Sequence, residues 1–126
     1  MKSITHLTSR DAWLASRQTG VYTAPSLDSE GFIHCSRPDQ VVKVANAFYT
    51  GQRGLVLLVI DPSRLTSELK WEPPAHPAPG QAPVTDDLFP HLYGPLNADA
   101  VTSVLDFDPD ETGLFHLPLE LTTNYQ

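Results

Sequence analysis

The chain has 126 residues, of which 40% are hydrophobic and 18% charged, so it can bury one core and is not a disordered chain. Its formal net charge of -7 disfavours binding to the phosphate backbone of nucleic acids. A lone cysteine excludes an intramolecular disulfide, and no segment approaches the ~20 apolar residues of a membrane helix. We therefore expect a single cytoplasmic domain over residues 1–126 that binds neither nucleic acid nor membrane.

Residue patterns in the first thirty positions predict a strand and then a helix. Alternation of β-branched residues favours a strand over 3–8. The helix over 8–20 can begin at Thr8 or Ser9, whose hydroxyls suit a cap, and can end at Gly20. Residues 21–31 are expected to form a short extended piece and then a polar loop.

The second confident strand covers residues 32–36, "FIHCS", and a second helix follows over 36–51. Ser36 can cap this helix, and Pro38 lies in its first turn, where a missing N–H is harmless. Apolar residues at helical spacing predict a core-facing side, made of Val41, Val44, Ala45 and Phe48.

The remainder of the chain is mostly strand-like, with a proline-rich interruption. Apolar alternation and β-branched content predict strands over 54–61, 69–72, 88–94, 101–107 and 113–118. The run "LVLLVI" is apolar throughout, which favours a central strand covered on both faces. Residues 73–87 form a long proline-rich loop, and such loops are commonly functional. The order of elements predicts an α+β fold.

Three histidines lie inside predicted strands: His6 in "ITHLT", His34 in "FIHCS" and His91 in "FPHLY". Histidine is costly inside a core unless it is hydrogen-bonded, and a single one is usually structural. Three of them in separate strands favour convergence at one cleft.

Three chemistries are open to such a cleft. Neutral imidazoles can bind and polarise a small molecule, or an imidazole and Glu72 can carry protons. The three histidines and Glu72 can also hold a metal ion, but metal ligands usually include two members close in sequence, and here each comes from a different element. We therefore expect no metal.

Three residues beside these histidines, Cys35, Ser36 and Tyr93, are also considered for the site. Adjacent residues on a strand point to opposite faces, so Cys35 cannot pair with His34 and is expected to be a small core residue. Ser36 shares the face of His34 and either contacts a ligand or only caps the helix. Tyr93 shares the face of His91 and either contacts a ring or ribose or is simply half-buried.

Several segments together resemble family 952 of the domains of unknown function, over residues 3–107: "ITHLT", "GVYTAPSLDSEGFIHCSRPDQVVKVANAFY", "GLVLLVIDPSRL", "LKWE" and "FPHLYGPLNADAV". That family is grouped with the ADP-ribosyltransferase-like proteins. The resemblance implies a split β-sheet core with two main helices near the N-terminal half, and NAD as a cofactor.

The resemblance also implies places for individual residues. His6 in "THLT" is similar in place to a histidine that holds the adenosine ribose of NAD, although Leu7 replaces a glycine. His34 lies near the position of a tyrosine that stacks on nicotinamide. His91 stands in the region where those enzymes carry their catalytic glutamate.

The expected function is that of a transferase or hydrolase for an NAD-like, nucleotide or glycosidic small molecule. The expected catalytic residues are His34, His91 and Glu72, with His91 as the proton carrier. The expected ligand-binding residues are His6, Ser36 and Tyr93. The missing glutamate keeps a second reading open, a metabolite-binding module without turnover, and a third is a structural or partner-binding protein with merely buried histidines. Protein partners are not predicted.

Overall fold

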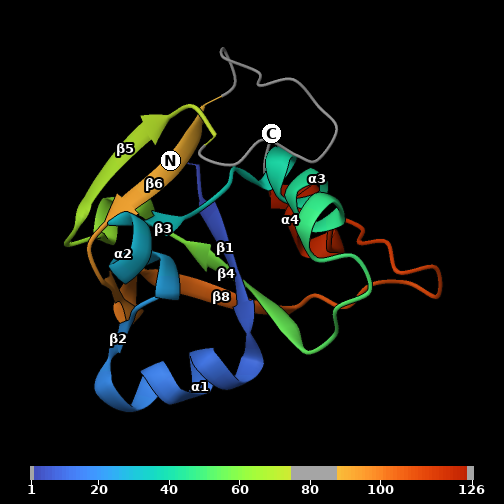
Figure 1. Cartoon of the computed structure of the whole chain (residues 1–126), viewed down its shortest axis with the longest axis horizontal. Helices are drawn as coiled ribbons and strands as arrows, with labels where there is room; N and C mark the ends of the chain where they lie inside the picture. Colours follow the sequence, from blue (N-terminus) through green and yellow to red (C-terminus); the bar gives the residue numbers. More distant parts are fainter. Residues whose placement is uncertain (1, 75–87, 125–126) are drawn as a thin grey trace.

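The computed structural model describes residues 2–74 and 88–124, and its helices and strands follow in an irregular order (Figure 1). The helices are α1 (Arg10–Thr19), α2 (Pro25–Glu30), α3 (Pro38–Phe48) and α4 (Leu119–Asn124), with two 3₁₀ turns at Pro62–Arg64 and Ala98–Ala100. The strands are β1 (Ile4–Ser9), β2 (Val21–Tyr22), β3 (Ile33–His34), β4 (Leu55–Ile60), β5 (Glu68–Glu72), β6 (Phe89–Tyr93), β7 (Leu96–Asn97) and β8 (Val101–Asp106). The predicted α+β class is confirmed.

The described strands form three small antiparallel sheets. The first has the order β1-β4-β8, the second pairs β2 with β7, and the third has the order β3-β6-β5. The central position of β4 confirms the prediction from its apolar run, since all six of its residues are buried.

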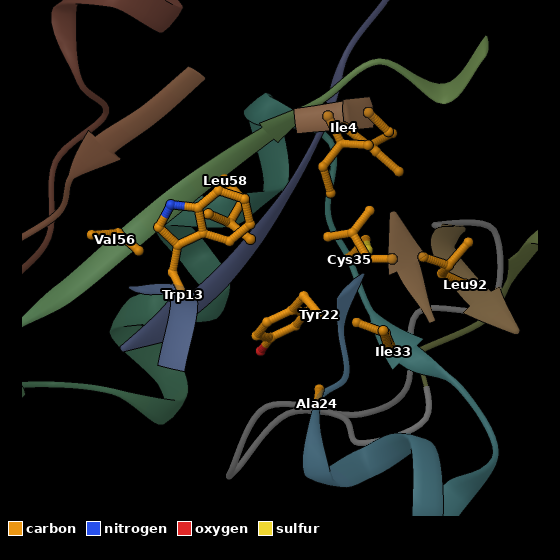
Figure 2. Packing of buried hydrophobic residues seen from close by; sticks show 12 residues of the cluster. Ile4, Trp13, Tyr22, Ala24, Ile33, Cys35, Val56, Leu58 and Leu92 are labelled. Carbon is orange, nitrogen blue, oxygen red and sulfur yellow. The ribbon is translucent and has the colours of Figure 1, made fainter. Parts of the chain in front are cut away.

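The β1-β4-β8 sheet separates two hydrophobic clusters, which explains the apolar run of β4. Val56, Leu58 and Ile60 contribute to one cluster, while the alternating residues Leu55, Leu57 and Val59 contribute to the other. The first cluster includes Trp13 of α1 and the inward residues of the β3-β6-β5 sheet (Figure 2). The second includes α3 and the segment after β8.

The predicted ends of α1 are confirmed, but the start of α3 is not where the sequence suggested. Ser9 caps α1 by accepting from the amide of Ala12 at 3.1 Å, and Gly20 ends it in the left-handed region at φ 79°. The N-cap of α3 is Arg37, whose amide donates to the Gln40 side chain at 2.9 Å. Ser36 does not cap α3, because the helix begins at Pro38 and the N-cap position is Arg37; Ser36 instead forms a backbone bridge with Thr5 of β1.

Three further expectations are corrected. Residues 25–30 form the short helix α2, which Pro25 begins and Gly31 ends, where a polar loop was expected. Residues 113–118 form no strand, because the side chain of Asn46 takes the place of a strand neighbour by bonding the amide and carbonyl of Phe115 at 2.7 and 3.3 Å. Phe48 is 46% exposed and belongs to neither core cluster.

The expected proline-rich loop falls mainly on residues 75–87, which lie outside the described residues. Within the two described stretches, no helix combines the length and apolar character needed to cross a bilayer.

A buried hydrogen-bond chain through His6 joins all three sheets. Nδ1 of His6 on β1 donates to the carbonyl of His34 on β3 at 2.5 Å. Burial lowers the pKa of His6 to about 4, so the ring is neutral, and its Nε2 accepts from the hydroxyl of Tyr22 on β2 at 2.9 Å. The hydroxyls of Tyr22 and Thr8 share a further hydrogen bond of 2.9 Å. Both nitrogens of His6 are therefore occupied within the fold.

We predict that Leu58→Ala lowers the free energy of unfolding by roughly 2–5 kcal/mol, because Leu58 is fully buried and its truncation leaves a cavity. Leu14→Ala is the matched control, since Leu14 is 49% exposed on α1 and its change should stay within about 0.5 kcal/mol. Urea denaturation measures both values, and equal losses for the two variants would contradict the buried position of β4.

We predict that His6 makes the fold acid-sensitive. Its folded-state pKa of about 4 lies below the ordinary 6.5, so the unfolded chain takes up the proton more readily. The stability is complete above pH 6.5 and is lost as the pH falls towards 4, by about 3 kcal/mol in all.

Denaturation of the wild type and of His6→Gln between pH 7 and 4 measures this contribution. The other titrating groups are common to both proteins, so the difference between the two pH profiles isolates His6. A variant that loses as much stability with acid as the wild type would refute the prediction.

Candidate functional site

The outer face of the β3-β6-β5 sheet gathers most of the predicted site residues. In this sheet His34 of β3 lies directly opposite His91 of β6, and His91 lies opposite Lys70 of β5. Residues directly opposite one another project to the same face, and so do residues two apart on one strand. Tyr93 and Glu72 therefore share this face, while Ile33 and Leu92 point into the first core cluster.

Glu72 binds the two polar side chains of β6. One of its oxygens accepts from Nδ1 of His91 at 2.8 Å and from the hydroxyl of Tyr93 at 2.6 Å. These two hydrogen bonds, that of Tyr93 first, lower the pKa of Glu72, so the group is a carboxylate. The same bond raises the pKa of Tyr93, which therefore keeps its proton.

The carboxylate decides the tautomer of His91. Because an ionised carboxylate only accepts, Nδ1 of His91 carries a hydrogen, so in the neutral form of the ring Nε2 is the nitrogen with the lone pair. His91 is 3% exposed, and its Nε2 has no hydrogen-bond partner within residues 2–74 and 88–124. An imidazole held in this way can accept a proton or a hydrogen bond from a bound molecule.

Aromatic contacts hold the ring of His91 from one side. Phe32 stacks on it with ring centroids 4.3 Å apart and planes 24° apart. The same phenylalanine meets His34 edge-on at 4.8 Å and Tyr93 at 5.3 Å. The sequence analysis did not single out Phe32, although its place two residues before His34 puts it on the same face.

His34 lies beside His91 but is more open to solvent. Their ring centroids are 5.7 Å apart, and Nε2 of His34 lies 3.2 Å from a carboxylate oxygen of Glu30 at the end of α2. Lys70 places its ammonium 4.7 Å from the ring centroid of Tyr93, a cation–π contact. Glu30 and Lys70 are two further neighbours that the sequence analysis did not single out. Glu30 was missed because α2 was expected to be a loop, whereas Lys70 lies on a strand that was expected.

A pocket of about 340 Å³ lies between this sheet and α3. Its described lining residues come from β3 and the segment after it, from α3 and from the β5-β6 pair; they are His34, Cys35, Ser36, Val44, Phe48, Tyr49, Pro74, Phe89 and His91. Its size is within the range of about 300–1,000 Å³ that is typical of small-molecule sites.

The predicted site residues thus divide into three groups. His34, His91 and Ser36 line the pocket, and Glu72 and Tyr93 are connected to it through His91. His6 contacts only the backbone of His34 among them, and its ring nitrogens are used within the fold. His34 and His91 therefore converge with their rings in contact, whereas His6 lies on the other side of β3 and contacts its backbone.

Cys35 occupies the position expected from strand alternation. It is 3% exposed, it belongs to the first core cluster, and burial raises the pKa of its thiol to about 12. The thiol stays protonated at neutral pH and is a poor nucleophile. The prediction that it is a small core residue is confirmed, although one part of it reaches the wall of the pocket.

Neither a metal site nor a place for His116 in the pocket is supported by the described residues. No group of three or more His, Cys, Asp or Glu side chains within residues 2–74 and 88–124 is arranged to hold a metal ion. His116 pairs with Asp110 at 2.6 Å in an exposed loop and stands apart from the pocket lining, as expected for a surface histidine.

Comparisons with known proteins give a family and solved relatives. The family model described as a protein of unknown function, DUF952, matches residues 7–104. The crystal structure of protein CC0527 from Caulobacter crescentus is 33% identical, with a TM-score of 0.78 over 95% of this chain and 98% of that one. The solution structure of CC0527 is 31% identical, with a TM-score of 0.66 over 90% of this chain and 91% of that one. No curated protein matches significantly. The chain belongs to the DUF952 family.

Proposed function

We propose that this protein is a transferase or hydrolase that acts on an NAD-like, nucleotide or glycosidic small molecule in the pocket beside His91. The observation that carries the proposal is the pairing of His91 with Glu72. The carboxylate holds Nδ1 at 2.8 Å, while Nε2 is left with a lone pair and His91 lines the pocket. The choice of substrate class rests on the resemblance to ADP-ribosyltransferase-like proteins.

His91 is the proton carrier in this proposal. Nε2 removes a proton from water or from an acceptor hydroxyl while the oxygen forms a bond to the sugar carbon. The electron pair of the glycosidic bond departs with the leaving group, and the proton passes from His91 to that group or to solvent. Glu72 stabilises the imidazolium and keeps the ring in place, which makes it a positioning residue.

The remaining polar neighbours orient the substrate and the ring. Tyr93 donates to Glu72, and Phe32 stacks on His91, so the imidazole is held from two directions. His34 and Ser36 line the pocket and contact the bound molecule in this proposal. His6 acts through the backbone of His34, which it positions, instead of touching the ligand.

A metabolite-binding module without turnover is the second candidate. It is favoured by the absence of an acidic side chain among the described residues that line the pocket. Glycosyl transfer usually relies on a carboxylate beside the reacting carbon, and Glu72 is engaged with His91 and Tyr93 instead.

We predict that His91→Asn lowers the rate of product formation about 100-fold or more, since it removes the proton carrier. Glu72→Gln should lower the rate less, because the ring remains in place without the charge that stabilises it. NAD, ADP-ribose and nucleosides are the substrates to test, with products separated by chromatography.

His116→Asn is the matched control, because His116 also pairs with a carboxylate but lies in an exposed loop. Its rate should equal that of the wild type. Binding of these compounds with no product from the wild type would favour the module without turnover, and equal rates for His91→Asn and the control would refute the role of His91.

A further inference from the structure

The pocket beside His91 carries no charge of its own on its described lining. None of the described residues that form its wall is Lys, Arg, Asp or Glu. The chain as a whole is acidic, with a formal net charge of -7, and the carboxylate of Glu72 lies directly behind His91. Burying an unpaired charge is costly, so the part of a ligand that enters this pocket is uncharged.

The walls favour a flat ring. Three aromatic side chains, Phe48, Tyr49 and Phe89, line the pocket together with aliphatic carbon from Val44 and Pro74. Phe48 remains 46% exposed at the end of α3. A planar ring gains both burial and face or edge contacts against such side chains.

Two polar groups of the wall, on His91 and Ser36, have no partner among the described residues. His91 is 3% exposed and Ser36 is 7% exposed, yet neither Nε2 of His91 nor the hydroxyl of Ser36 bonds to any residue of the described stretches. The hydroxyl is not used as a helix cap, because Arg37 holds the N-cap position. Among the described residues, every polar side-chain atom that is fully buried has a hydrogen-bond partner. These two atoms have none, so each must keep some solvent-accessible surface.

The chemistry of these two atoms defines what they accept. In the neutral form of His91, Nε2 carries the lone pair because Nδ1 holds the hydrogen that is donated to Glu72, so the matching ligand group is a donor. The hydroxyl of Ser36 can donate to a ligand oxygen. A ligand that displaces water from these two atoms must replace their hydrogen bonds, so a ligand that satisfies both atoms gains affinity over one that satisfies neither.

We infer that the pocket binds an uncharged planar ring that carries an N–H donor and a carbonyl acceptor, as in a lactam or a pyrimidinone, with the N–H on His91 and the carbonyl on Ser36. The inference rests on the second function proposed above, binding without turnover, because the ring N–H occupies the Nε2 that the transferase or hydrolase would use as its base. Sugar or phosphate parts of a larger molecule stay outside the apolar walls.

The test uses 2-pyridone, a flat ring with both groups, titrated into isotope-labelled protein and followed by NMR. It should shift the signals of His34 to Ser36, Phe48, Phe89 and His91 together. N-methyl-2-pyridone keeps the ring and the carbonyl but lacks the donor, and it should bind about tenfold more weakly. Benzoate, a charged ring, should bind more weakly still.

Ser36→Ala should weaken 2-pyridone about tenfold and leave the roughly tenfold preference of the wild type for N–H over N–CH₃ intact. Ser29→Ala on the exposed face of α2 is the matched control and should bind as the wild type does. The two ring compounds are compared on the unchanged protein, so their comparison does not depend on the folding of any variant.

The outcomes separate this inference from the proposed function. Equal binding of the two pyridones, tighter binding of benzoate, or no shift at the pocket with 2-pyridone would overturn the inference. Selective binding of 2-pyridone without turnover of NAD, ADP-ribose or nucleosides would support the inference and refute the enzyme. Turnover that depends on His91, with no selectivity for 2-pyridone, would support the enzyme and refute the ring assignment.

Discussion

One buried imidazole connects the three sheets of this fold. His6 reaches from β1 to the backbone of β3 on one side and to Tyr22 of β2 on the other. A neutral ring has one donor and one acceptor, and both are used, so the two contacts require one orientation of the ring. Because the polar groups are enclosed between the sheets, a shift of any of these strands would leave a buried group without a partner, at a cost of about 1–3 kcal/mol.

The short strand β3 depends most on this arrangement. It has only two residues, and it is held by β6 on one side and by contacts from β1 on the other, through His6 and through the pairing of Thr5 with Ser36. In this position of β3, the side chain of Ile33 lies in the core and that of His34 lies on the outer face of the sheet. The structural histidine His6 behind the sheet therefore helps to hold the strand that carries one of the two pocket histidines in front of it.

The outer face of the β3-β6-β5 sheet combines the imidazole of His91, held by Glu72, with a pocket whose described wall contains no Lys, Arg, Asp or Glu. Glu72 places its charge behind His91, where it polarises the ring without entering the pocket lining. The pocket in front is largely apolar, with the open atoms of His91 and Ser36 among its few polar groups. An imidazole held by a carboxylate at the edge of a largely apolar pocket suits a reaction on a small molecule or its selective binding, and the two differ only in whether a bond is broken.

His6 and His91 lie in similar local sequences but differ in how their ring nitrogens are hydrogen-bonded. "ITHLT" and "FPHLY" both place a histidine in an apolar strand, yet both nitrogens of His6 are bonded, while only Nδ1 of His91 has a partner among the described residues. The partners lie 28 and 16 residues away for His6 and 19 residues away for His91. Periodicity reports the face on which a side chain lies, but it carries no information on partners at such separations.

The sequence by itself determined what depends on neighbours along the chain. The central burial of β4, the ends of α1 at Ser9 and Gly20, and the opposite faces of His34 and Cys35 all follow from alternation, run length and capping chemistry. Only the tertiary structure decided the rest: that Arg37 and not Ser36 caps α3, that the Asn46 side chain bonds the backbone of Phe115, and that Glu72 pairs with His91. These outcomes depend on which distant groups meet in space, and the hydrogen bonds that decide them form only when the sheets pack together.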